Sequence, residues 1–154
     1  MKLLSVVLFF GLMAPFLSSC ASSNKTTANP PKTAAATQVS LPGTEWMLTD
    51  LAGTPALPGG KATLAFPEAG RVAGNGSCNR FTGSVVISGD TLKMGPLAST
   101  RMACVDNDVS KQEDAYFKAL NAATRYAYQD PYLLIYAEGF DKPLRFTRAA
   151  SSHP

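Results

Sequence analysis

Three cysteines carry most of the chemistry that this 154-residue sequence offers. Cys20 stands near the start of the chain, while Cys78 and Cys104 lie in its second half. A cysteine thiol can be acylated, can form a disulfide, or can take part in redox exchange when its pKa is lowered. The only histidine, His153, is next to the last residue. The rest of the sequence therefore supplies no histidine for a Ser-His-Asp triad or a zinc site.

The residues before Cys20 indicate export. Lys2 is followed by an apolar run from residue 3 to 17 that contains no charge and is too short to span a bilayer comfortably. The run ends in Leu17-Ser18-Ser19-Cys20, which resembles the lipobox that the bacterial lipoprotein-processing peptidase reads. The resemblance implies removal of residues 1–19 and acylation of Cys20, because several acyl chains together hold a protein firmly on a membrane. Ordinary secretion with a free Cys20 thiol is the alternative.

The resemblance also implies a cellular location for the protein. Ala21 follows the cysteine, where aspartate retains enterobacterial lipoproteins in the inner membrane. Alanine therefore implies the outer membrane, with the protein facing the periplasm of the cell envelope. Residues 20–40 are rich in Ser, Thr, Ala, Pro and Lys and hold a single large aliphatic residue, so they cannot bury enough apolar surface to offset their ordering entropy. We interpret them as the lipidated N-terminus and a flexible tether.

Composition limits the remaining function classes. Removing residues 1–19 takes away only Lys2 from the 14 basic residues, and the 11 acidic residues remain, so the mature charge is +2. That charge is scattered and too small to indicate nucleic-acid binding. Asp106 and Asp108 lack the glycine and closing glutamate of a calcium loop, and no phosphate-binding glycine loop is present. We therefore expect no cofactor, no metal and no enzyme activity.

Apolar residues alternate through most of residues 41–148, which favours half-buried strands. The alternation is clear at Trp46 and Leu48, at Ala62 to Phe66, at Phe81 to Ile87 with Val86 as the exception, at Leu92 and Met94, and at Leu144 and Phe146. The strand expected from Tyr132 to Tyr136 is apolar on both faces. One helix of about 12–15 residues is expected, because Ser110 and Glu113 have the spacing of a capping box with Ser110 as N-cap. Residues 149–154 are interpreted as a disordered tail. The fold class is thus mainly antiparallel β with one α-helix, in a single domain.

Cys78 and Cys104 form an even pair in an exported chain, where disulfides form and persist. A bond between them closes a loop of 27 residues, which the loop-entropy relation values at about 3.5 kcal/mol. Free buried thiols are an alternative, and so is a redox-active pair, although the C-x-x-C spacing that tunes a thiolate is missing. We expect a structural disulfide.

The two cysteines lie in two distinctive segments. The first is Gly74-Asn75-Gly76-Ser77-Cys78-Asn79-Arg80-Phe81-Thr82-Gly83, and the second is Leu97-Ala98-Ser99-Thr100-Arg101-Met102-Ala103-Cys104. With Trp46 and Leu48 upstream and Leu133, Leu134 and Phe146 downstream, they resemble the META domain, the family of the heat-shock protein HslJ. The resemblance covers residues 41–148 and implies a small barrel-like antiparallel sheet with one helix. It also implies an envelope protein linked to heat shock and antibiotic tolerance.

The family resemblance supplies no catalytic residues, so the motif residues need a physical interpretation. Gly74, Gly76 and Gly83 suit positive φ or close strand approach. Asn79 suits a turn, while Arg80 and Arg101 suit binding an anion or covering a sheet edge. All three are candidate binding residues. The sequence favours a non-enzymatic envelope lipoprotein that binds or stabilises another envelope component under stress. A carrier of a small apolar ligand, using a barrel cavity, is the alternative.

Lipidation of Cys20 can be tested directly. Radioactive palmitate fed to cells that express the chain should label the wild-type protein, whereas Cys20→Ser should carry no label because it has no thiol to acylate. Gel autoradiography of the immunoprecipitated proteins measures the difference. Equal labelling of both proteins would reject the lipid anchor.

Overall fold

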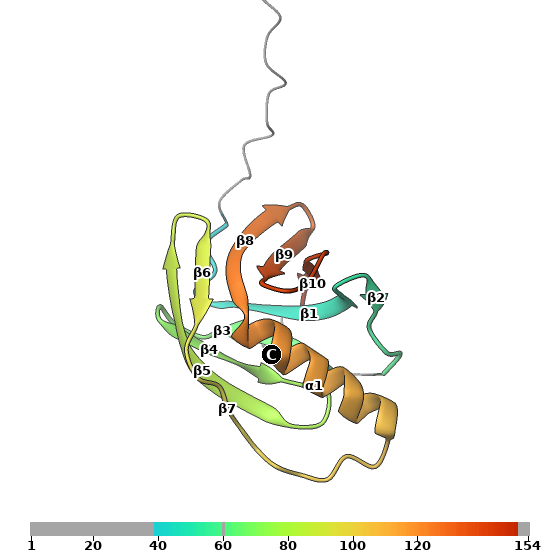
Figure 1. The fold of residues 1–154 in the computed structure, drawn as a ribbon. Coiled ribbons are helices and arrows are strands. Elements are labelled where there is room, and N and C mark those ends of the chain that lie inside the picture. Colours follow the sequence, from blue (N-terminus) through green and yellow to red (C-terminus); the bar gives the residue numbers. More distant parts are fainter. Residues whose placement is uncertain (1–38, 60, 151–154) are drawn as a thin grey trace, which may run out of the picture. The chain divides into compact units, whose positions relative to one another are not determined.

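The computed structural model describes residues 39–59 and 61–150, which contain ten strands and one helix (Figure 1). The predicted signal peptide, Cys20 and almost all of the predicted tether lie outside the described residues, as do residues 151–154. The strands are β1 (Thr44–Leu51), β2 (Thr54–Pro55), β3 (Thr63–Phe66), β4 (Arg71–Asn75), β5 (Arg80–Ser88), β6 (Thr91–Met94), β7 (Ala98–Ser99), β8 (Ala123–Gln129), β9 (Tyr132–Ala137) and β10 (Leu144–Arg148). The helix is α1 (Asn107–Asn121).

Eight of the strands close into an antiparallel barrel. The order is β1-β3-β4-β5-β6-β8-β9-β10, and β10 pairs with β1 to complete the circle. Trp46 on β1 shows the closure, because it pairs with Leu64 of β3 on one side and Arg148 of β10 on the other. The two remaining strands pair outside this circle, β2 with β1 and β7 with β5. The expected fold class of antiparallel β with one helix is therefore confirmed.

The alternating segments of the sequence form strands as predicted, with Ser88 and Thr91 pairing across the Gly89-Asp90 turn. Two barrel strands were not predicted. β4 has only one large apolar residue, Val72, which gives its alternation little contrast. β8 follows α1 with no glycine or proline between them, so nothing in the sequence separates its first residue, Ala123, from the expected helix. The helix in fact ends at Asn121.

The predicted N-cap of the helix was wrong. Asp106, not Ser110, precedes the first turn, and its carboxylate accepts hydrogen bonds from the backbone N–H groups of Asp108 and Val109. The helix therefore starts three residues before Ser110, and the Ser110 N–H is already used in a bond to the Asp106 carbonyl. Glu113 is then free of any capping role, and its side chain turns toward the barrel.

The helix lies across the barrel and contributes to its core (Figure 1). Tyr116 is fully buried, with ring contacts to Phe81 of β5 and Phe146 of β10, and its hydroxyl donates to the Thr63 carbonyl of β3. Large side chains from the barrel strands fill the interior around it: Trp46, Leu64, Phe66, Leu92, Leu133, Ile135 and Leu144. No helix in the described part of the chain is long and apolar enough to cross a bilayer.

Two ends of the domain differ slightly from the sequence-based boundaries of 41 and 148. Val39 packs against the core and Leu41 is fully buried. At the other end Ala149, which the sequence assigned to the tail, donates its N–H to the Glu45 carbonyl of β1. The folded unit therefore extends beyond both expected limits, to Val39 at one end and to Ala149 at the other.

Burial raises the pKa of the Tyr116 phenol well above its ordinary value of 10.0. The stability that neutral Tyr116 contributes is therefore complete below that ordinary value and is lost as pH rises through the raised pKa. Tyr116→Phe should lower the free energy of unfolding by about 1 kcal/mol at neutral pH, because the Thr63 carbonyl loses its donor. Its stability should then fall less than that of the wild type above about pH 10.

Urea unfolding curves recorded from neutral to alkaline pH measure both effects. Tyr132→Phe is a matched control, because that ring is 37% exposed. It should change the free energy of unfolding by less than about 0.5 kcal/mol. If the free energy of unfolding of Tyr116→Phe and of the wild type fell equally at alkaline pH, the burial argument would be contradicted.

Candidate functional site

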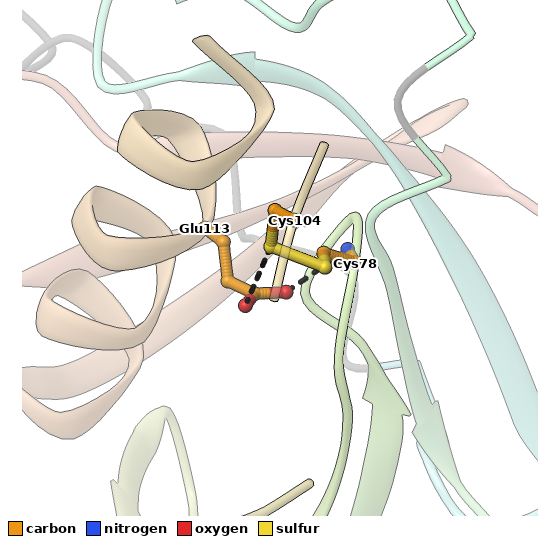
Figure 2. A group of neighbouring side chains, drawn as sticks. All are labelled: Cys78, Cys104 and Glu113. Atoms are coloured by element: carbon orange, nitrogen blue, oxygen red, sulfur yellow. Dashed lines mark hydrogen bonds between the residues drawn. A yellow bond between two sulfur atoms is a disulfide. The ribbon is translucent and has the colours of Figure 1, made fainter. Parts of the chain in front are cut away.

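The two cysteine segments and the helix meet at one corner of the barrel, which we call the cysteine corner: residues 75–80, residues 100–104, and Gln112 with Glu113. Cys78 and Cys104 are joined by a disulfide, as the sequence predicted, with their Cα atoms 5.9 Å apart. The bond ties the connection between β4 and β5 to the connection between β7 and α1. Figure 2 shows the carboxylate of Glu113 beside the two sulfur atoms.

Glu113 is a buried carboxylate that three donors satisfy, with 6% of its surface exposed. One oxygen accepts the backbone N–H groups of Cys78 at 2.9 Å and Asn79 at 2.6 Å. The other accepts the Asn79 side-chain amide at 2.6 Å. Hydrogen bonds to an ionised acceptor are the stronger kind, so this carboxylate holds the helix onto the β4–β5 connection.

Asn79 is buried as well, and its side-chain amide joins three parts of the corner. Its oxygen accepts the Thr100 hydroxyl at 2.9 Å and the Met102 N–H at 2.8 Å. Its nitrogen donates to Glu113 and, at 3.3 Å, to the Met102 carbonyl. The amide thus brackets the backbone of Met102 as a neighbouring strand residue would. The expected turn bond of Asn79 is replaced by bonds to a segment more than 20 residues away.

Gln112 and Gly76 complete the corner. Gln112 accepts the Leu57 N–H at 2.7 Å and donates to the Ser77 hydroxyl at 2.8 Å. Gly76 lies so close to the helix that an added Cβ would come within 2.6 Å of the Phe117 ring and 2.7 Å of a Glu113 oxygen. Its glycine is therefore explained by close approach to the helix and not by the positive φ or the close strand approach expected for the motif glycines. Ser77 has a positive φ of 115°.

The sulfur atoms of Cys78 and Cys104 and a Glu113 oxygen lie within 4.8 Å of one another, which is close enough to hold a metal ion. The chemistry of these donors does not fit that use. Thiolates bind metals, whereas these two sulfurs are joined to each other. Both carboxylate oxygens already accept strong hydrogen bonds. The cluster acts as a structural clamp in its disulfide form.

The three candidate binding residues do not share one place. Asn79 is buried within the corner, whereas Arg80 and Arg101 are exposed on its two flanking segments. Neither arginine forms an ion pair within residues 39–59 and 61–150. The structure therefore gives Asn79 a role inside the domain and leaves the arginines at the surface.

The sequence interpretation missed the role of Glu113 and Gln112. The signal was present in the helical spacing, because residues 112, 113, 116, 119 and 120 form one buried stripe. A stripe that begins with glutamine and glutamate requires buried partners for both side chains. The partners of Glu113, Cys78 and Asn79, and one partner of Gln112, Ser77, come from a loop whose conformation the sequence did not specify.

The tyrosines of the C-terminal hairpin divide between the core and the surface. Tyr126 is buried, while two others stack under arginines on the barrel exterior. The Arg125 guanidinium lies 3.5 Å from the Tyr136 ring centroid, and that of Arg145 lies 5.3 Å from Tyr132. Arg145 is also 3.8 Å from an Asp50 oxygen. These rings have partners from the chain itself, as ordinary strand-surface residues do.

Fold and site together define a small disulfide-linked β-barrel domain with one helix, held at one corner by a buried carboxylate. The sequence model of the META domain matches residues 39–151. The chain therefore belongs to the META domain family, as the resemblance of its two cysteine segments implied. Comparison with curated proteins finds no similar one.

Solved structures support this assignment at the level of the fold. A Burkholderia xenovorans protein solved by NMR is 28% identical, with a TM-score of 0.59 over 71% of this chain and 84% of that one. A DUF4847 family protein from Bacteroides vulgatus, solved by crystallography, is 16% identical, with a TM-score of 0.50 over 70% of this chain and 93% of that one. The second likeness concerns the fold alone.

Replacing Glu113 should destabilise the domain. Glu113→Gln keeps the volume but places a donor amide against the donors of Cys78 and Asn79, so at least one buried bond is lost. We expect a loss of about 2–3 kcal/mol in the free energy of unfolding, as for hydrogen bonds to charged groups. Urea denaturation of the oxidised protein measures it.

Glu138→Gln is the matched control, since Glu138 is exposed and no ion pair holds it among the described residues. It should change stability by less than about 0.5 kcal/mol. If the two glutamine variants unfolded at the same urea concentration, Glu113 would not be the clamp described above.

Proposed function

We propose that this protein is an exported lipoprotein of the bacterial envelope, anchored through Cys20, whose META domain binds or stabilises another envelope component under stress. The lipobox resemblance and the polar composition of residues 21–38 support the anchor. Membership of the META domain family supports the envelope role, because the resemblance to this family implied an envelope protein. The disulfide agrees with an oxidising compartment.

One observation carries the proposal that the protein works by binding and not by catalysis. Every buried polar side-chain atom of the described residues has a hydrogen-bond partner within the chain. The buried polar side chains of Glu113 and Asn79 in the cysteine corner are directed at the protein itself. Such groups stabilise a shape, and the contacts that serve function then belong to the surface.

The arrangement of the barrel favours a surface role over transport of a small apolar ligand. Trp46, Phe81 and Phe146 are at most 2% exposed and project into the interior, where Tyr116 packs against two of them. An interior occupied by close-packed rings has no ready space for cargo. A carrier that held its cargo inside the barrel would require these rings to move apart.

Crosslinking in intact cells tests the proposal. A short amine-reactive crosslinker applied before membrane extraction should recover one reproducible protein partner with the wild-type chain. Cys20→Ser should recover it at a much lower yield, because the domain is no longer concentrated at the membrane.

Glu138→Gln serves as a control for handling, since it leaves both the anchor and the fold in place. Absence of any reproducible partner across stressed and unstressed cells would overturn the binding role. Turnover of a substrate by the purified wild-type protein would overturn the non-enzymatic assignment.

A further inference from the structure

The segment between β6 and α1 is held firmly although it buries very little. Residues 98–103 are all exposed, and Met102 keeps 60% of its surface accessible. Val105, three residues on, is fully exposed. Exposed apolar side chains on a connection usually accompany mobility, because little burial offsets the entropy of ordering. Here several directed interactions offset it.

These interactions fix the backbone of the segment along one side. β7 pairs with β5 through Phe81↔Ser99 and Thr82↔Ala98. The Thr100 N–H then donates to the Arg80 carbonyl at 3.0 Å, and Asn79 brackets Met102. Cys104 ends the segment with the disulfide. The clamp of the cysteine corner therefore positions an exposed, extended strand.

The opposite side of this strand offers free backbone groups. In an antiparallel pair, residues alternate between hydrogen-bonded and non-hydrogen-bonded positions. Because Thr100 bonds to Arg80, its neighbour Ser99 is at a non-hydrogen-bonded position, so its N–H and carbonyl point away from β5. The Arg101 N–H lies between two inward donors, Thr100 and Met102, and points outward as well. Within the described residues no strand pairs with this edge of β7.

Charge indicates which partner this edge accepts. Arg101 follows Thr100 in this segment, and Arg80 lies opposite Thr100 on β5. Neither arginine meets a carboxylate within 4.0 Å in the part of the chain that is described. A second copy of the chain pairing edge to edge would bring the same arginines together, and like charges across a strand pair are destabilising. An extended segment with acidic side chains would instead place opposite charges across the pair.

We propose that the outer edge of β7, from Ala98 to Met102, receives an extended acidic segment of an envelope protein as an added antiparallel or parallel strand. Backbone bonds to Ser99 and Arg101 would supply affinity, and Arg80 and Arg101 would select acidic side chains. Met102 would contribute apolar contact area. The inference rests on the proposed function and names the surface and the partner chemistry through which it operates.

A synthetic peptide of alternating glutamate and valine serves as the probe. Titrated into the ¹⁵N-labelled full chain in detergent micelles, it should shift the amide resonances of residues 98–102 and slow hydrogen exchange of the Ser99 and Arg101 amides. Arg80→Glu combined with Arg101→Glu should weaken binding by about tenfold or more, because attraction becomes repulsion. Lys93→Glu, an exposed charge change on β6, should leave the affinity unchanged.

Two further peptides separate strand addition from simple charge attraction. A peptide N-methylated on alternate residues, along the edge that would face β7, should bind at least about tenfold more weakly, and a lysine-valine peptide should not bind. Equal binding of the N-methylated peptide, or shifts away from residues 98–102, would overturn the β7 edge as the site.

In cells, a photo-crosslinking residue at Met102 or at Lys93 distinguishes strand addition at β7 from the broader proposal that the protein binds an envelope component. Crosslinks from position 102 to the same partner that the chemical crosslinker recovers would support strand addition, provided that position 93 gives none. If the partner is recovered but position 102 never reaches it, the β7 edge is wrong while the binding role stands. If no partner is recovered by either method, the binding role itself fails.

Discussion

The buried carboxylate of Glu113 is the interaction on which the rest of this domain depends. A carboxylate can be removed from water only when strong donors replace its hydration, and here the backbone of Cys78 and Asn79 and the Asn79 amide do so. Those donors exist only if the β4–β5 connection adopts one conformation, and the helix must lie against it for Glu113 to reach them. Helix position, loop conformation and the Asn79 amide are thereby fixed together.

The disulfide and the carboxylate act on the same corner by different means. The bond between Cys78 and Cys104 restricts the unfolded chain and holds two connections near each other. It does not fix the orientation of either connection, whereas directed hydrogen bonds to Glu113 and from Met102 and Thr100 do so. Gly76 is part of the same constraint, since a side chain there would occupy the space of Phe117 and the carboxylate. A short motif thus encodes a covalent link, a close approach and a hydrogen-bonded amide.

The sequence predicted the barrel better than it predicted the site, for a physical reason. Alternation reports which face of a strand is buried, so strands such as β1, β3 and β10 were recognised from their own residues. β4 was missed because a single large residue, Val72, gives too little contrast. The role of Glu113 could not be recognised locally, because its partners are about 35 residues away and its spacing from Ser110 also fits a capping box. A buried polar residue is defined by what it meets, and that information lies in the tertiary structure.

Stability and recognition are connected in this fold through the residues from Ala98 to Cys104. A barrel that closes completely has no sheet edges. Eight of the ten strands belong to such a closed circle, in which each strand pairs with a neighbour on both sides. β7 stands outside the circle and therefore keeps one edge, and the interactions that hold it are those of the buried corner. Interactions inside the domain thus fix the conformation of an exposed strand. If the strand receives a partner, it loses little further conformational entropy on binding, which is the condition under which a short edge can bind usefully.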